Sequence, residues 1–167
     1  MTARRTTLLL ASIAILLAGG ARAESWRSYH NERFGTTADA PANWTMGPEP
    51  ENDDGREFTS PDQHAQLTIS GIFANVDAND ELASRLEAGQ GETITFKKRQ
   101  GKWTVVSGTK GDRIFYRKTL LSCGDQVAND LFIEYPAAEK EKYDALVAHV
   151  TASLRPGRGY GVTMKCR

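Results

Sequence analysis

Three extended apolar segments within residues 103–136 constrain the fold most, because only short turns of Gly, Asp and Asn separate them. Such segments predict β-strands joined by hairpins, which together form a β-meander. Side chains alternate along a strand, so Ile114, Tyr116 and Leu120 share one face, whereas Phe115 and Leu121 share the other. A sheet that is apolar on both faces needs cover on both faces.

Two segments have the spacing of helices that could supply this cover. Residues 137–154 follow Pro136 and place apolar side chains three and four positions apart, and Pro156 and Gly157 end the pattern. These apolar side chains are Tyr143, Leu146, Val147, Val150 and Leu154. A shorter helix is expected over residues 79–88, with Asn79 or Asp80 as its N-cap and with Leu82 and Leu86 on one face.

The remaining segments predict further antiparallel strands. Residues 25–41 predict an opening hairpin, and residues 56–60 and 65–74 predict a second one. Residues 92–99 predict a strand that leads into the meander. The expected fold class is therefore α+β, an antiparallel β-sheet flanked by helices on both faces in an α/β/α sandwich.

The first 23 residues have the pattern of a secretory signal peptide. Arg4 and Arg5 precede the apolar residues 8–18, and the small-residue motif Ala21-Arg22-Ala23 follows. Cleavage after Ala23 would leave residues 24–167, which we interpret as a single α+β domain in the periplasm or secreted. The apolar run is shorter than the roughly 20 residues that a spanning helix needs, so a membrane anchor is not expected. No later apolar stretch is long enough to span a membrane, so no span is expected after cleavage either.

Cys123 and Cys166 are the only cysteines, and in an exported protein they are expected to form a disulfide. The bond would close a loop of about 44 residues and stabilise the fold by roughly 4 kcal/mol. It would hold the C-terminal tail on the turn between the last two strands of the meander. A redox or metal-binding pair is disfavoured, because the Cys-x-x-Cys spacing is absent.

Charge is distributed unevenly along the chain. Residues 24–96 contain 4 Lys/Arg and 14 Asp/Glu, whereas residues 97–167 contain 14 Lys/Arg and 7 Asp/Glu. Acidic and basic strands could neutralise each other across the sheet, or the molecule could present a dipolar surface to a charged partner. The candidate partner-binding residues are Lys97, Lys98, Arg99, Lys102, Lys110 and Arg113. Because the protein is expected to be exported, nucleic acid is not expected to be that partner.

No residue pattern indicates catalysis, a metal site or a cofactor. The acidic loop around Gly55 fails the register of an EF-hand, because Pro50 and Pro61 stand where ligands are required. The histidines, His30, His64 and His149, are scattered and lack zinc-ligand spacing. No G-x-S-x-G motif is present either.

Several short motifs resemble a known family. They are Tyr29-x-Asn31-x-Arg33-Phe34-Gly35, Ala40-Pro41, Trp44, Asp54-Gly55, Phe58 and Ser60-Pro61-Asp62. With the strand at Trp103, the strand end at Tyr135-Pro136 and the last helix, they resemble small secreted bacterial proteins whose fold is like that of PsbP, the extrinsic subunit of photosystem II. The resemblance implies the α/β/α sandwich. Thr36 and Thr37 replace a familiar aromatic residue, which predicts a less buried strand there.

The functional hypothesis is a non-catalytic periplasmic or secreted accessory or protein-binding module. PsbP helps to retain calcium and chloride at the oxygen-evolving centre, and a nuclear import factor with the same fold binds the GTPase Ran. Neither activity transfers to this chain, because no functional residue of either protein can be matched. The alternative is a small-ligand-binding or hydrolytic protein with a cleft between sheet and helix. A deep pocket that gathers Asp, Glu, His or Arg side chains would favour this alternative.

Overall fold

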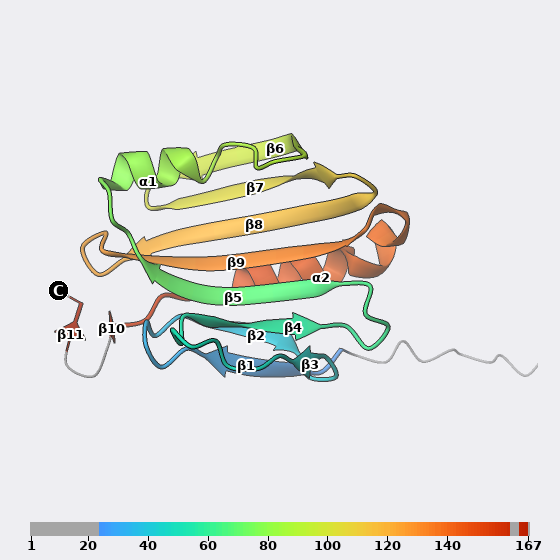
Figure 1. Cartoon of the computed structure of the whole chain (residues 1–167), viewed down its shortest axis with the longest axis horizontal. Coiled ribbons are helices and arrows are strands. Elements are labelled where there is room, and N and C mark those ends of the chain that lie inside the picture. The colour runs from blue at the N-terminus through green and yellow to red at the C-terminus, as the bar shows by residue number, and fades with distance from the viewer. Residues whose placement is uncertain (1–23, 161–163, 167) are drawn as a thin grey trace, which may run out of the picture.

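A seven-stranded antiparallel sheet forms the centre of the computed structural model, which describes residues 24–160 and 164–166 (Figure 1). The expected signal peptide, residues 1–23, lies outside the described residues. Across the sheet the strands follow the order β3-β4-β5-β9-β8-β7-β6. The strands are β3 (Thr45–Met46), β4 (Gly55–Thr59), β5 (Gln66–Phe73), β6 (Glu92–Gln100), β7 (Trp103–Lys110), β8 (Arg113–Ser122) and β9 (Val127–Pro136).

The predicted meander is confirmed as β7, β8 and β9, which pair in sequence order. Both predicted hairpins are also confirmed. The first is β1 (Trp26–His30) with β2 (Thr37–Pro41), and the second is β4 with β5. A small C-terminal hairpin pairs β10 (Gly159–Tyr160) with β11 (Met164–Lys165).

The main core lies between the sheet and helix α2 (Lys140–Ser153), which follows the 3₁₀ turn η1 (Ala137–Glu139). All five predicted apolar side chains of this segment are buried. The β1–β2 hairpin packs against the same helix, since the Trp26 ring stacks on the His149 ring with 3.7 Å between centroids. Ile114, Tyr116 and Leu120 pack against this core, as the alternation along β8 predicts.

On the opposite face, Leu82 of helix α1 (Ala78–Ser84) clusters with Leu121 and Ala128. The described part of the chain thus forms a mostly antiparallel sheet with two α-helices. Only the short helix α1 lies against this second face, so helical cover of both faces is not established.

The predicted bounds and cap of the shorter helix were wrong. The helix begins after Asp77, whose Oδ1 accepts a hydrogen bond from the backbone N–H of Asn79 at 2.8 Å. It ends at Ser84, because the N–H groups of Leu86 and Glu87 bond to carbonyls three residues earlier and form tight turns. Leu86 therefore does not share a helical face with Leu82.

The predicted exposure of the segment at Thr36 was also wrong. Thr36 is fully buried, and its hydroxyl donates to Asn129 Oδ1 at 2.7 Å. A hydrogen-bonded threonine can therefore occupy an interior position.

The predicted disulfide is confirmed between Cys123, in the β8–β9 turn, and Cys166. It anchors the C-terminal hairpin on the cluster that Phe34 and Val127 form. None of the helices in the described ranges is long and apolar enough to cross a membrane.

Candidate functional site

Strand β6, at the edge of the sheet, carries three of the predicted partner-binding residues. Pairing with β7 sets Lys98 opposite Val105 and Lys97 opposite Val106, so neighbouring side chains lie on opposite faces. Lys98 lies on the face that α2 occupies, with its ammonium 5.5 Å from the centroid of the Trp103 ring. Arg99 points to the other face and donates to Asn79 Oδ1 at 2.5 Å.

The other three predicted residues lie at the two ends of β7. Lys102 precedes the strand and pairs with Asp125 at 2.8 Å. Lys110 and Arg113 flank the turn at the far end, where Arg113 pairs with Glu134 at 3.1 Å. The structure therefore does not gather the six basic residues into one patch, and their role in partner binding stays a prediction.

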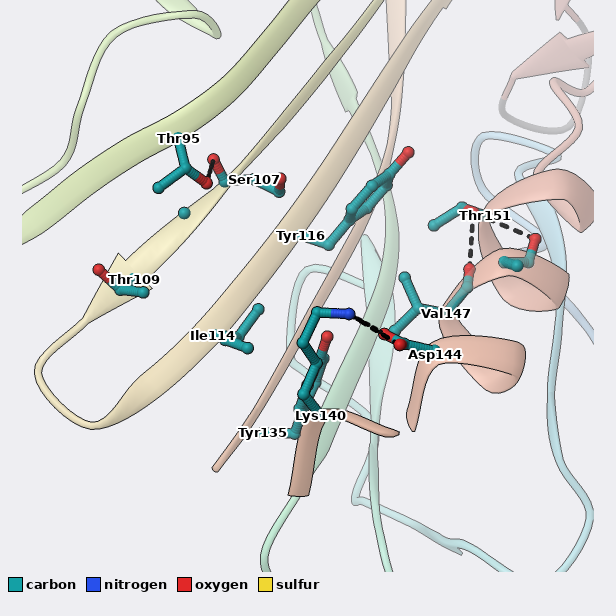
Figure 2. A pocket seen from close by; sticks show the side chains of 12 residues that line it. Thr95, Ser107, Thr109, Ile114, Tyr116, Tyr135, Lys140, Asp144, Val147 and Thr151 are labelled. Atoms are coloured by element: carbon teal, nitrogen blue, oxygen red, sulfur yellow. Dashed lines mark hydrogen bonds and ion pairs between the residues drawn. The ribbon is translucent and has the colours of Figure 1, made fainter. Parts of the chain in front are cut away.

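A groove separates α2 from the strands that extend past it. Its first hollow, of about 460 Å³, lies between the β7–β8 hairpin and α2, as Figure 2 shows. Its second hollow, of about 570 Å³, shares Tyr116 and Thr151 with the first. The two hollows meet at these residues, whose side chains hydrogen-bond to each other, and we call the pair of hollows the α2 groove. Its apolar side chains include Trp103, Val105, Ile114, Leu120, Val147 and Leu154.

Two cations line the end of the α2 groove that lies at the C-terminus of the helix. Lys118 donates to the carbonyl of Thr151 at 2.6 Å, and Arg155 donates to the carbonyls of Ala152 and Leu154. Neither cation pairs with a carboxylate of the described residues. Burial and the nearby charge of Arg155 lower the pKa of Lys118. This end of the groove is therefore suited to a negatively charged group.

The side chains that line the α2 groove do not form a catalytic set. The first hollow has one ion pair, in which Lys140 holds Asp144 at 2.7 Å, and burial raises the pKa of Tyr116 and of Tyr135. No His or Cys is among the lining residues of either hollow, and the one carboxylate among them, that of Asp144, is held in the ion pair with Lys140.

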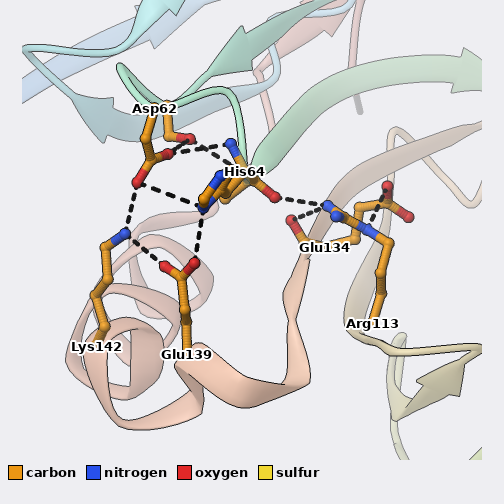
Figure 3. A network of polar contacts seen from close by, with 8 residues as sticks. Asp62, His64, Arg113, Glu134, Glu139 and Lys142 are labelled. Atoms are coloured by element: carbon orange, nitrogen blue, oxygen red, sulfur yellow. Dashed lines mark hydrogen bonds and ion pairs between the residues drawn. The ribbon is translucent and has the colours of Figure 1, made fainter.

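A second group of polar side chains joins the β4–β5 turn to the start of α2, as Figure 3 shows. His64 Nδ1 lies 2.7 Å from Glu139 Oε1, and Lys142 Nζ lies 2.7 Å from Asp62 Oδ2 and 2.6 Å from Glu139 Oε2. The hydrogen bonds from Lys142 lower the pKa of Asp62 and of Glu139. The sequence did not reveal this cluster, because His64 and Glu139 are 75 positions apart.

Ion pairs on the sheet face that carries α1 join the acidic and basic halves of the chain. Arg117 pairs with Glu92 at 2.8 Å, and Arg85 pairs with Asp130 at 2.9 Å. The pair between Arg117 and Glu92 and the pair between Lys142 and Asp62 each join an acidic side chain of the first half to a basic side chain of the second, which favours neutralisation between the halves over a purely dipolar surface.

The fold is similar to that of three solved structures. Cyanobacterial PsbP (CyanoP) from Synechocystis sp. PCC 6803 aligns with a TM-score of 0.59 and 13% identity, over 83% of this chain and 96% of that one. The Ran-binding protein Mog1p of Saccharomyces cerevisiae aligns with a TM-score of 0.55 and 6% identity, over 80% of this chain and 96% of that one. LpqN of Mycobacterium tuberculosis, which is involved in cell envelope biogenesis, aligns with a TM-score of 0.51 and 14% identity, over 80% of this chain and 91% of that one.

These likenesses confirm the predicted PsbP-like fold. At such low identities they show the fold alone. No family model matches the sequence, and no curated protein does. The function must therefore be argued from the surface of this chain.

Proposed function

We propose that this chain is a non-catalytic accessory module of the periplasm or extracellular space that binds a protein partner through the α2 groove. The observation that carries the proposal is the groove itself, which combines an apolar floor, a cationic end and no catalytic set. The partner segment would supply apolar side chains for the floor and acidic side chains for Lys98, Lys118 and Arg155.

The position of β6 supports this choice of surface. As the last strand of the sheet it leaves one edge unpaired among the described strands, and Thr95 of β6 lines the groove. Its aromatic residue Phe96 is 51% exposed. An extended segment of a partner could add to this edge and place alternate side chains over the groove.

The comparisons support the class of function but not the partner. Mog1p is a Ran-binding protein and LpqN is involved in cell envelope biogenesis, so the same fold supports a protein-binding role and an envelope role elsewhere. We extend both roles to this chain as proposals, along with export through residues 1–23, a single domain over residues 24–167 and the α/β/α sandwich. The pairing of Cys123 with Cys166 supports an oxidising compartment.

A charge reversal with a matched neighbour tests the binding surface. Lys98→Glu places a negative charge beside the groove, whereas Lys97→Glu makes the same change on the opposite face of the same exposed strand. We expect a partner captured from the envelope fraction by the wild type and by K97E to be lost with K98E. Because the contact is partly electrostatic, capture should also weaken as salt rises. Equal capture by K98E, or no capture even at low salt, would refute the proposal.

A second candidate function is the binding of a small amphiphile with an anionic group. Hollows of about 460 and 570 Å³ fall in the usual range for small-molecule sites, and the cations Lys118 and Arg155 lie at one end. Mass spectrometry of an organic extract from the natively produced protein would detect such a ligand. Its loss in Lys118→Glu, with no loss in K97E, would favour this function over protein binding.

A further inference from the structure

Three potential metal ligands converge where the β4–β5 turn meets the start of α2. One nitrogen of His64 and one carboxylate oxygen each of Asp62 and Glu139 all lie within 4.8 Å of one another. We propose that Asp62, His64 and Glu139 form a binding site for a divalent transition metal, with Zn²⁺ as the best match. This inference is independent of the α2 groove.

The ligand types fit zinc. Imidazole nitrogen and carboxylate oxygen both bind zinc, and three protein ligands leave a fourth position for water. Donor atoms around tetrahedral zinc lie roughly 3.3 Å apart, given bonds of about 2.0 Å. His64 Nδ1 now lies 2.7 Å from the Glu139 oxygen and 4.0 Å from the Asp62 oxygen. The chosen oxygens of Asp62 and Glu139 lie within 4.8 Å of each other, so rotation of the partly exposed side chains by up to about 1.5 Å in total would bring the three donors to zinc geometry.

The surrounding hydrogen bonds already orient Asp62 and His64. Asp62 Oδ1 accepts from the Ser60 hydroxyl at 2.6 Å and from the His64 backbone N–H at 3.1 Å, while Oδ2 lies on the side of the cluster. Arg113 donates to the His64 carbonyl at 2.9 Å, which holds the turn in place. Such outer contacts fix the ligands of a metal before it binds and contribute to its affinity.

Lys142 acts as an internal competitor for the metal. Its ammonium lies between the two carboxylates, at 2.7 Å from Asp62 and 2.6 Å from Glu139. The Lys142 side chain is 51% exposed, so it can rotate into solvent when a metal replaces its charge. Zinc bound here would connect the β4–β5 turn to η1 and would stabilise the native state by mass action.

Zinc titration by isothermal calorimetry tests the site, with the purified protein first stripped by EDTA. We expect one zinc per chain for the wild type, binding at least about 10-fold weaker in His64→Ala, and binding at least about 10-fold tighter in Lys142→Met. His30→Ala is the matched control, because His30 is also exposed and its ring lies 2.9 Å from the Thr37 hydroxyl, outside the cluster. Circular dichroism would verify that each variant is folded.

The outcomes distinguish a specific zinc site at Asp62, His64 and Glu139 from zinc binding by any exposed histidine. Zinc should raise the melting temperature of the wild type and of K142M but not that of H64A. Equal zinc affinity in H64A and the wild type, an equal loss in H30A, or no gain in K142M would each overturn the proposal. These measurements need no partner protein, so their failure would leave the proposed function unaffected.

Discussion

The guanidinium of Arg85 lies 2.9 Å from the carboxylate of Asp130, which joins the residue after α1 to the middle of β9. Both side chains are largely buried, with 25% and 17% of their surface exposed. Burial raises the pKa of Asp130, although Arg85 and the hydroxyl of Thr119 favour its charged form. The pair therefore connects α1 to the sheet. Removal of one partner would leave the charge of the other buried without a counter-charge, which destabilises the fold.

The first prediction concerns this pair. Arg85→Met should lower the free energy of unfolding by about 3 kcal/mol, since it leaves the carboxylates of Asp130 and of Glu81 without their counter-charge. Urea denaturation at pH 7 measures the loss. The double variant R85M/D130N should recover part of it, and a double variant no more stable than R85M would contradict this account.

The loss in R85M should also depend on pH. A carboxyl group whose pKa is raised by folding adds stability below its unfolded pKa of 3.8, and this stability is lost as pH rises through the folded pKa. Removing Arg85 raises the folded pKa further. The difference between the wild type and R85M should therefore be largest at pH 7 and shrink toward pH 4. A pH-independent difference would show that Asp130 does not titrate as described.

The second prediction concerns the disulfide. Replacing Cys123 and Cys166 by serine should lower the free energy of unfolding by about 4 kcal/mol, because the bond closes a loop with a sequence separation of 43. Denaturant unfolding of the oxidised protein and of the double variant gives the difference. Two free thiols in the native protein by non-reducing mass spectrometry would refute the bond itself.

The third prediction concerns the close approach of β6 to β7. A Cβ on Gly108 would lie 2.1 Å from the Thr93 carbonyl oxygen, which belongs to the backbone of β6. Gly108→Ala should therefore push β6 away and cost about 1 to 3 kcal/mol. Ser107→Ala, at the neighbouring position, should change stability by less than about 0.5 kcal/mol. Equal effects of the two variants would refute this close approach.

The fourth prediction compares two leucines near α1. Leu82 is 1% exposed and packs on Leu121 and Ala128, whereas Leu86 lies beyond the helix and is half-buried. Leu82→Ala should cost about 2 to 3 kcal/mol, and Leu86→Ala less than about 1 kcal/mol. Thermal or urea unfolding distinguishes them. A larger loss at Leu86 would indicate that the helix extends further than Ser84.

Much of the fold follows from local patterns. The strands β7, β8 and β9 were predictable because alternating side chains and turn residues act over a few positions. Helix α2 was predictable because its apolar residues repeat at helical spacing and Pro156 ends them. The pairing of Cys123 with Cys166 followed because the chain has no other cysteine.

The predictions were wrong where contacts outside the local sequence pattern determine the structure. Asp77 caps α1 in place of Asn79 or Asp80, and the tight turns after Ser84 end the helix before Leu86. Thr36 is buried because Asn129, 93 positions away, accepts its hydrogen bond. Such a partner cannot be identified from the residues that flank Thr36.

The sequence by itself determined where the main strands and helices lie along the chain, because backbone preference and side-chain periodicity are local. Only the tertiary structure decided where binding could occur. It placed α2 beside β7 and β8 to form the groove, brought Glu139 to His64, and set Lys98 on the sheet face opposite Lys97 and Arg99. These relationships depend on how the elements pack against one another. Packing brings together residues that are far apart along the chain, and no local sequence pattern indicates which of them will meet.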